Sequence, residues 1–439
     1  MASDFSVGSA GSVQSRTYHD PLHGAIALDG DDPVEALLIR LIDTPAFQRL
    51  RRIRQLGPAS LTFHGAEASR FTHSLGVMAV ARRAFDQLEA HHPQLLPHRA
   101  AVLCGALLHD IGHGPFSHTC EEIFGCEHEH WTGRILQEHE PIRRLLEQYD
   151  LHLLAEIQQI YRKQHPVACV WQLVSSQLDC DRIDYLMRDS YSTGISYGRL
   201  DLDRILLALR FDPATQQLAV ARKGLAAIEH YLIVRYFMYA QVYNHPKNIA
   251  ATWVLFHALK RARELLASGL WADDTVTAWL SQDCNQLQLR DYLNADDGVF
   301  VYHLQRWASS GLANTSADPV PDPVLADPVL ADLCRRFVDR DLLKCCDVTH
   351  FSAEHRQKLL ADVQQALTDQ GLEASYYAGL RTTQSSGYTL YHHGIQLKTT
   401  AGLVEISEYS PLIKTLTQPW QRSWLVYPRQ LDPLVASWP

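Results

Sequence analysis

Residues 107–118 read LLHDIGHGPFSH, in which two leucines precede three histidines, one aspartate and two glycines. The residues before it, 99–106, are mostly apolar and predict a buried helix that ends in His109 and Asp110. Two glycines and a proline then predict an irregular loop. Burying imidazole and carboxylate groups without partners is energetically costly. The stretch therefore predicts a helix end whose polar side chains hold a ligand or satisfy one another.

The overall composition is that of a soluble globular protein. The 439 residues are 46% hydrophobic and 20% charged, which is enough apolar material for one large domain or for two to three ordinary ones. The net charge of −9 argues against bulk nucleic-acid binding, which usually needs a basic surface. The apolar run at residues 100–108 is too short to cross a bilayer, so no membrane partner is expected.

The nine cysteines are scattered without a CxxC pair, which makes a poor disulfide framework and fits a reducing cytoplasm best. Cys345 and Cys346 are expected to pack rather than to take part in redox chemistry. Residues 1–15 are rich in Gly and Ser and lack the basic and apolar regions of a signal peptide. They are expected to form a disordered tail.

The periodicity predicts a mainly α fold, with a helical core over residues 16–340 and a C-terminal α+β subdomain over 341–439. Small β-hairpins are expected near residues 20–29 and 218–221, and two or three strands within 387–410. The helices are expected at 44–56, 74–90, 99–111, 128–137, 167–186, 201–209, 225–243 and 353–370. The repeat DPVPDPVLADPVLAD at 318–332 is expected to be an exposed insertion ahead of a helix at Leu333.

Four polar residues on three predicted helices form a candidate metal site. His73 lies in SRFTHSLG, His109 and Asp110 end the next helix, and Asp181 lies in QLDCDRIDY. Two carboxylates offset the charge of one divalent ion, and two imidazoles favour Mn, Fe, Co, Ni or Zn over Mg. Taken alone, the His-Asp pair is equally compatible with a satisfied helix end that binds no metal.

The order H…HD…D is that of the HD-domain phosphohydrolase superfamily. Within it the chain resembles the deoxynucleoside triphosphate triphosphohydrolases, most closely the branch of the animal sterile-alpha-motif/HD-domain enzymes, although no sterile-alpha-motif domain is recognised. The resemblance extends from about residue 18 to about residue 344. It rests on the motifs HDPLHG, DTPAFQRLRRIRQLG, SRFTHSLG, LLHDIGHGPFSH, HEHWTGRIL, DCDRIDYLMRD and QVYNHPK.

The resemblance implies a metal-dependent hydrolase that converts a dNTP to a deoxynucleoside and tripolyphosphate, with Mg accompanying the nucleotide phosphates. It assigns the metal to His73, His109, Asp110 and Asp181. The catalytic residues that it implies are His118 and Glu121, as the acid-base pair, with His113 and His128. The substrate-binding residues that it implies are Arg70, Gln55, Leu56, Arg182, Tyr185, Asp189, Arg235 and Tyr243. The animal enzyme has Lys where this chain has Arg182.

The resemblance also implies a homo-oligomer, specifically a tetramer assembled by a GTP or dNTP activator. Asp43, Gln48 and Arg51 match positions that recognise a guanine nucleotide at a subunit interface. A neighbouring activator site aligns more loosely with Arg204, Arg222, Lys223, Arg340 and Lys344. The alternative is a solvated helix face with scattered basic residues.

Other functions remain open. His113, His118 and His128 would bind a second metal if the chain were an HD-type phosphodiesterase or nucleotidase acting on mono- or cyclic nucleotides. A monophosphate, however, would leave several predicted tail-binding groups unused, namely Arg70, Arg182, Tyr185 and Arg235. A non-catalytic nucleotide-sensing module is the third possibility.

The remaining histidines are not assigned to chemistry. His91, His92 and His98 flank a proline-containing loop and are expected to be solvated. His130 is expected at the surface, and the pair His392-His393 is expected to be incidental.

Overall fold

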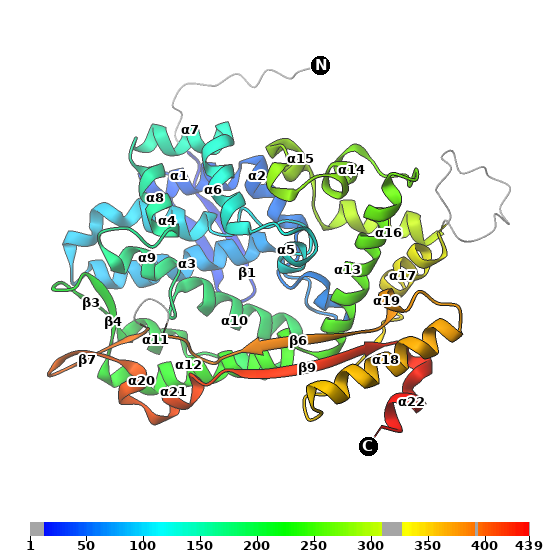
Figure 1. Cartoon of the computed structure of the whole chain (residues 1–439). Helices are drawn as coiled ribbons and strands as arrows, with labels where there is room; N and C mark the ends of the chain where they lie inside the picture. Colours follow the sequence, from blue (N-terminus) through cyan, green and yellow to red (C-terminus); the bar gives the residue numbers. More distant parts are fainter. Residues whose placement is uncertain (1–12, 310–326, 391–393, 439) are drawn as a thin grey trace, which may run out of the picture.

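A computed structural model describes residues 13–309, 327–390 and 394–438 (Figure 1). The predicted fold class is confirmed: the chain is mainly helical with small sheets. The helices up to residue 193 are α1 (Pro33–Ile42), α2 (Pro45–Gln48), α3 (Arg70–Glu89), α4 (Arg99–Leu108), α5 (His118–Phe124), α6 (His128–Glu138), α7 (Glu140–Tyr149), α8 (Leu153–Tyr161), α9 (Ala168–Val174) and α10 (Cys180–Thr193). The later helices are α11 (Leu202–Ala208), α12 (Leu225–Met238), α13 (Pro246–Leu266), α14 (Asp274–Ser281), α15 (Leu289–Asn294), α16 (Asp297–Ser309), α17 (Pro328–Val338), α18 (Ala353–Asp369), α19 (Ala374–Tyr377), α20 (Ile406–Tyr409), α21 (Pro411–Leu416) and α22 (Asp432–Ala436).

Short 3₁₀ turns and one π-helical segment connect or extend these helices. The 3₁₀ turns are η1 (Arg49–Arg52), η2 (Gly57–Leu61), η3 (Pro93–His98), η4 (Ser196–Gly198), η5 (Arg222–Gly224), η7 (Cys284–Gln286) and η9 (Arg429–Leu431). The π-helical segment η6 (Tyr239–Tyr243) continues α12. None of the helices in the described ranges is long and apolar enough to cross a membrane.

The strands form three small sheets. β1 (Arg16–Asp20) and β2 (Gly24–Leu28) make the expected N-terminal hairpin. The second sheet has the order β3 (Leu209–Asp212), β4 (Gln217–Ala221), β7 (Gln396–Thr399) and β8 (Gly402–Glu405), with β4 and β7 parallel. The third has the order β5 (Lys344–Asp347), β9 (Trp420–Tyr427) and β6 (Gly379–Ser385), and it runs along the lower side of the helical body in Figure 1. In the second sheet, β7 and β8 follow residue 341 in the chain and extend the pair formed by β3 and β4 of the helical core.

The central helix of the core is α4. Every residue from Ala100 to Leu108 is buried, and α4 packs against α3 and α8. α3 in turn also packs against α10. Because α4 is apolar along its whole length, only its end is available for polar chemistry, and His109 lies at that end. A second core joins α13 to the third sheet, with Val254 and Leu255 in the same cluster as Leu425 and Val426.

Two predicted helices are interrupted, for identifiable physical reasons. The helix expected over 167–186 is two helices, because the Asp179 side chain accepts hydrogen bonds from the backbone N–H groups of Ser176 and Arg182 and caps α10. The helix expected over 44–56 tightens into η1 after Gln48 and ends there. Arg49 at this transition is buried, and its guanidinium donates to backbone carbonyls on distant segments.

Part of the expected insertion at 318–332 is ordered helix. Residues 310–326 lie outside the described residues, but Asp327 caps α17 by accepting from the backbone N–H of Leu330. Pro328 then occupies the first turn, where its missing N–H is not needed. Leu330 is fully buried. The last copy of the repeat is therefore a helix start rather than an exposed loop.

Two expectations about side chains were wrong. Cys126 and Cys284 form a disulfide with a Cα–Cα distance of 5.5 Å, across a sequence separation of 158 residues that conceals the pairing in the sequence. His98, expected in solvent, is half-buried, with its ring centroid 4.9 Å from that of His165. His130 is exposed as expected. The predicted residues His392 and His393, and residues 1–12 of the predicted tail, lie outside the described part of the chain.

Candidate active site

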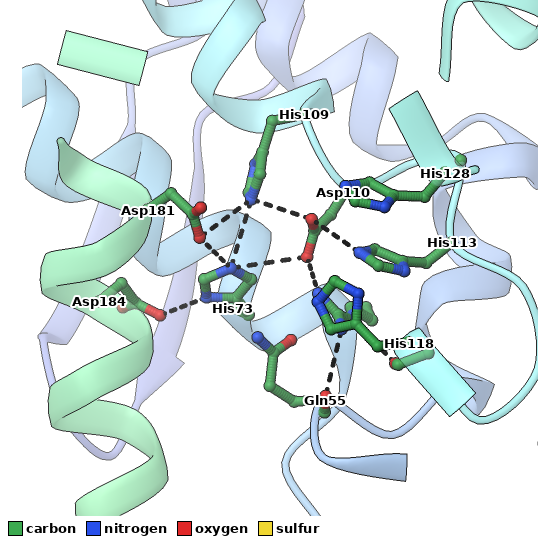
Figure 2. Close-up of polar contacts among 12 residues, drawn as sticks. Gln55, His73, His109, Asp110, His113, His118, His128, Asp181 and Asp184 are labelled. Atoms are coloured by element: carbon green, nitrogen blue, oxygen red, sulfur yellow. Dashed lines mark hydrogen bonds and ion pairs between the residues drawn. The ribbon is translucent and has the colours of Figure 1, made fainter. Parts of the chain in front are cut away.

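The candidate active site lies where three helices bring their ends together. His73 is in the first turn of α3, which Ser69 caps. His109 and Asp110 directly follow the last residue of α4, and Asp181 is in the first turn of α10. Figure 2 shows the polar ends of these four side chains pointing toward one another. The structure thus brings together the four residues that were expected to bind the metal.

The spacing of these atoms fits the ligands of one ion. Nε2 of His73 lies 3.3 Å from Nε2 of His109 and 3.1 Å from Oδ1 of Asp181. Asp110 lies with Oδ2 3.5 Å from Nε2 of His73 and Oδ1 3.2 Å from Nε2 of His109. Bonds of about 2.1 Å to one ion place neighbouring ligand atoms roughly 3.0 to 3.4 Å apart. The four side chains therefore need little movement to share a divalent ion.

The two imidazoles are also oriented for metal binding. Nδ1 of His109 lies 2.8 Å from the backbone carbonyl of Ala106, and Nδ1 of His73 lies 2.7 Å from Oδ2 of Asp184. When each Nδ1 donates its proton to that oxygen, the lone pair of each Nε2 faces the cluster. Such partners behind ligating histidines fix the tautomer and the ring orientation.

The cluster also attracts positive charge. Burial opposes a charge on His73, but hydrogen bonds to Asp181 and Asp184 outweigh burial and raise its pKa to about 10. Burial likewise opposes the charge of Asp181, yet hydrogen bonds from His109 and His73 lower its pKa. Carboxylates that hold protons on neighbouring imidazoles will hold a divalent cation in the same way. The donor set therefore fits a transition-metal ion in chemistry as well as in geometry.

A buried ionic network behind His73 was missed in the sequence. Asp184 is fully buried, and it accepts from His73, from Nε2 of His23 and from Nε and Nη2 of Arg188. Arg188 also donates to Asp20 at 2.8 Å. Asp184 follows Asp181 at helical spacing, and His23 and Asp20 lie in the motif HDPLHG. Both signals were available in the sequence but were assigned no role.

A second cluster lies beside Asp110 and contains His113, His118, Glu121 and His128. Glu121 bonds to Nδ1 of His118 at 3.0 Å and also to Nδ1 of His128. The rings of His113 and His128 stack, with centroids 3.9 Å apart. These four residues offer ligand atoms within 4.8 Å of one another, so they form a second candidate metal group.

The charges in this second cluster are set by its neighbours. Burial opposes ionisation of Glu121, but hydrogen bonds from His118 and His128 lower its pKa and keep the carboxylate ionised. Burial, together with the charges of Arg70 and His128, lowers the pKa of His113 well below its usual value. The cluster thus contains one fixed negative charge and one imidazole that stays neutral.

Arg70 connects the two clusters. Its Nη1 lies 2.6 Å from Oδ2 of Asp110, and its Nε donates to the Ser117 hydroxyl at 2.9 Å. Oδ1 of Asp110 lies 3.3 Å from Nε2 of His113. Asp110 therefore borders the metal cluster with one face and the second cluster with the other.

The loop between the clusters has an unusual backbone. Phe116 and Ser117 have positive φ angles of 61° and 57°, a conformation that costs an ordinary residue about 1 kcal/mol or more. Tertiary contacts hold it: the backbone N–H of Phe116 donates to buried Asp297 at 2.7 Å, and the Ser117 hydroxyl donates to the Arg54 carbonyl at 2.6 Å. These contacts fix His118, which begins α5 immediately afterwards.

Comparison with known proteins places the fold and the site in one family. Residues 70–185 match the HD domain, and residues 200–277 match the HD associated region. Uncharacterized protein YwfO of Bacillus subtilis is 33% identical over 428 residues, covering 95% of this chain and 93% of that protein. The chain belongs to the HD-domain phosphohydrolase superfamily. HD domains bind divalent metals, in agreement with the His-Asp cluster.

Two further proteins resemble this HD-domain phosphohydrolase. The crystal structure of a phosphohydrolase from Bacteroides thetaiotaomicron is 29% identical and covers 94% of this chain and 100% of that chain, with a TM-score of 0.80. Deoxynucleoside triphosphate triphosphohydrolase SAMHD1 of Gallus gallus is 30% identical over 285 residues, covering 56% of this chain and 45% of that protein. The match thus spans less than half of the animal protein.

The residues predicted to contact the outer phosphates lie on α10 and α12 of this HD-domain phosphohydrolase. Arg182 follows Asp181 and is paired with the Asp179 carboxylate. Arg235 is buried, and its Nη1 donates to Oε1 of Gln177 at 2.8 Å. The Nε atoms of both arginines are buried and have no partner among the described residues. Each guanidinium is therefore held on one side and has donor capacity left for an anion. Tyr185, predicted with them, is half-buried beside Tyr243.

The residues predicted to contact the sugar form a separate polar group. The Tyr243 hydroxyl donates to Oδ2 of Asp189 at 2.9 Å. Oδ1 of Asp189 and Oε1 of Gln55 are buried without a hydrogen-bond partner within the described ranges. Leu56 beside Gln55 is half-buried. Unpaired buried acceptors are unusual in proteins and mark places where a ligand donor fits.

The residues predicted for activator binding lie in three separate places. Asp43 pairs with Arg16, while Gln48 bonds to Nε of Arg51 at 2.8 Å, all near the α1–α2 corner. The second set, Arg204, Arg222 and Lys223, is exposed on α11 and η5. The third set is at the end of α17 and the start of β5, where Arg340 donates to the Leu61 carbonyl and Lys344 pairs with Asp432. Within one chain these sets do not meet.

Proposed function

We propose that the protein is a metal-dependent dNTP triphosphohydrolase that releases a deoxynucleoside and tripolyphosphate. The observation that carries the proposal is the position of Asp110, which faces the metal cluster on one side and Arg70 and His113 on the other. A triphosphate has to place one phosphorus at the metal and extend its remaining charge along cationic or donor groups. The similarity to the animal triphosphohydrolase supports the same substrate class.

The metal site would be formed by His73, His109, Asp110 and Asp181. A divalent ion bound there supplies Lewis acidity and lowers the pKa of a water molecule. The chain's own contribution is to fix the phosphate chain beside it. Arg70 presents a guanidinium that Asp110 and Ser117 hold in place, and a fork of this kind matches non-bridging phosphate oxygens.

The leaving group requires a proton, and we assign its delivery to His118. In the proposed reaction water adds to the α-phosphorus, the bond from phosphorus to the 5′-oxygen breaks, and that oxygen takes a proton. Glu121 accepts from Nδ1 of His118, so the Nε2 proton of an imidazolium remains available for the 5′-oxygen. The ionised state of Glu121 stabilises that imidazolium.

The sugar end would be held by Asp189, Gln55 and Tyr243. Asp189 and Gln55 each have a buried oxygen without a partner in the described ranges, and either oxygen would accept the one proton that the 3′-hydroxyl of a deoxyribose can donate. The Tyr243 ring, which packs near Tyr185, would lie against the sugar and leave no room for a 2′-hydroxyl.

The decisive test is product identification. The purified chain is incubated with each dNTP and Mn or Mg, with and without GTP, and the products are separated by anion-exchange chromatography. Deoxynucleoside and tripolyphosphate in equal amounts are expected. Monophosphate and pyrophosphate as products, or cleavage of cyclic nucleotides alone, would overturn the proposal.

A second candidate function has its own observation. His113, His118, Glu121 and His128 are spaced to bind a metal themselves, which favours a two-metal phosphodiesterase or nucleotidase. In that case His128→Ala would remove one metal equivalent. In the triphosphohydrolase it would leave the metal content unchanged and raise KM for the triphosphate.

We also propose that GTP or a dNTP activates the enzyme by assembling a homotetramer. The proposal is supported by the match of Asp43, Gln48 and Arg51 to positions that recognise a guanine nucleotide at a subunit interface. Added GTP and dGTP should increase the mass measured by light scattering and stimulate dATP hydrolysis. Arg51→Ala should reduce both effects without changing the basal rate, and an unchanged mass in wild type would contradict the proposal.

A further inference from the structure

A third group of side chains of the metal-ligating type lies at the opposite end of α4 from the His-Asp pair. His98 ends η3 immediately before α4, Glu156 is on α8, and His165 is in the segment between α8 and α9. One ligand atom from each of these residues lies within 4.8 Å of the other two. α4, α8 and α9 pack against one another, so the group joins three segments of the core (Figure 1).

His165 is buried and His98 is half-buried, and the two imidazoles form no hydrogen bond with each other. His165 is only 5% exposed. The His98 ring meets it edge to face, and Nδ1 of His98 is buried with no hydrogen-bond partner in the described part of the chain. Glu156 is half-buried, and its side chain has no hydrogen bond or ion pair with any described residue. Buried polar groups usually have a partner, which for groups left open in this way is a water molecule, an ion or a ligand.

The backbone beside His165 orients its ring for coordination. Nδ1 of His165 lies 3.2 Å from the carbonyl oxygen of Val167. In the tautomer with the proton on Nδ1, the ring donates to this carbonyl and leaves Nε2 unprotonated. A carbonyl oxygen that accepts from the other ring nitrogen is a usual partner of a histidine that binds a metal. The other tautomer, which accepts from the Val167 N–H at 3.1 Å, is the one that metal binding would deplete.

We propose that His98, Glu156 and His165 bind a divalent transition-metal ion, preferentially zinc, at a site separate from the active site. Two imidazoles and one carboxylate are a ligand set that zinc accepts, with water in the fourth position. Coordination draws ligand atoms to about 3.4 Å from one another. Rotation of the Glu156 side chain, which no described partner restrains, provides that movement.

The consequence of this site is structural rather than catalytic. The α4 helix of ten residues separates the two sites by roughly 15 Å, at 1.5 Å per residue. The ion would fix the start of α4 to α8 and to the segment that leads into α9. The end of α4 positions His109 and Asp110, so the second ion would stabilise the helix that carries the active-site pair.

Metal counting on the full chain tests the proposal. The untagged protein is stripped with a chelator, dialysed against Zn(II) or Co(II), desalted and measured by plasma mass spectrometry. The double variant Asp110→Ala/His128→Ala, which lacks a ligand in both candidate groups of the active site, should retain one equivalent. Adding His165→Ala should remove it, together with the visible Co(II) absorption. His91→Ala, which removes an exposed histidine of the same region, should change neither reading.

Two results would overturn the proposal. One is a double variant that binds no metal while its circular dichroism spectrum remains that of the wild type. The other is a His165→Ala protein with the same metal content as its parent. Should His165→Ala not fold, Glu156→Gln replaces it. Glu156 is half-exposed and the substitution preserves its size, so the fold should tolerate it. The variant should weaken Zn(II) binding at least tenfold in a chelator competition. Unchanged affinity in that variant contradicts the proposal equally.

Discussion

The two clusters that meet at Asp110 differ in how their side chains are held. In the metal cluster each histidine has a buried partner behind it, and His73 is completely buried. In the second cluster the side chain of His118 is 67% exposed, and its one hydrogen bond among the described residues is to Glu121. The first cluster is fixed by the core, whereas His118 and Glu121 of the second cluster lie on the short helix α5, which follows a strained loop.

This difference fits the chemical roles proposed for the two clusters. A metal site needs ligands that are already in place, because reorganising them weakens affinity. A proton donor needs access to a substrate that enters and leaves. The comparison therefore predicts that changes in the first cluster remove both metal and turnover, whereas changes in the second lower turnover or substrate affinity and leave the metal content unchanged.

The largest effect is expected for Asp110→Asn. The change preserves size and a partner for Arg70, but it removes the charge of the ligand that borders both clusters. Metal content should fall to background. Turnover should drop at least about 10³-fold, since a metal's contribution amounts to several kcal/mol of barrier. Mass spectrometry of the metal and steady-state kinetics measure the two losses, and full metal retention would break the comparison.

A smaller effect on rate, with no effect on metal, is expected for His118→Ala. Loss of a general acid lowers kcat by about 10² to 10⁴-fold, while the four metal ligands stay in place. Metal content and kcat are measured on the same preparation. His130→Ala removes an exposed histidine on α6 and should stay within about twofold of wild type. Metal loss in His118→Ala would favour the two-metal alternative.

A still smaller effect is expected behind the metal cluster, at Asp184→Asn. The change replaces the carboxylate that orients His73 with a neutral amide. Arg188 then has Asp20 as its remaining acidic partner. Metal affinity should fall about 10- to 100-fold, measured by chelator competition.

The matched control for Asp184→Asn is Asp203→Asn. Asp203 is paired with Arg83 at the surface, and such pairs contribute about 1 kcal/mol or less. This variant should leave metal affinity unchanged. Equal affinity in both variants would mean that the buried carboxylate does not act on the metal site.

The four side chains that the structure brings together could be selected from the sequence because they lie at helix ends, which local patterns mark. His73 follows a capping serine, and the His-Asp pair ends an apolar run. The helix break at Asp179 was missed, because one carboxylate that caps a helix overrides an otherwise continuous apolar pattern. The pairings of Cys126 with Cys284 and of His98 with His165 depend on tertiary contacts that no local spacing encodes.

The smallest effect is expected at the sugar end of the site, where Asp189 should make the free energy of unfolding depend on pH. Burial raises the pKa of Asp189 to about 7, although a hydrogen bond from Tyr243 opposes the rise. An unfolded aspartate titrates near 3.9. Between these values the folded chain holds a proton that the unfolded chain has released, so this group's contribution to stability falls as pH rises and is constant above about 7.

Asp189→Asn removes this dependence, because an amide does not titrate. From pH 5 to pH 8 the free energy of unfolding of the variant should therefore rise relative to wild type, by roughly 3 kcal/mol at most. Urea denaturation of both proteins at each pH measures the difference. Tyr243→Phe removes the hydrogen bond that lowers this pKa and should shift the transition to higher pH. A constant difference between Asp189→Asn and wild type would show that Asp189 is ionised throughout. Asp189 would then bind a sugar hydroxyl only as an ionised acceptor, with a permanent charge like the carboxylates of the metal cluster.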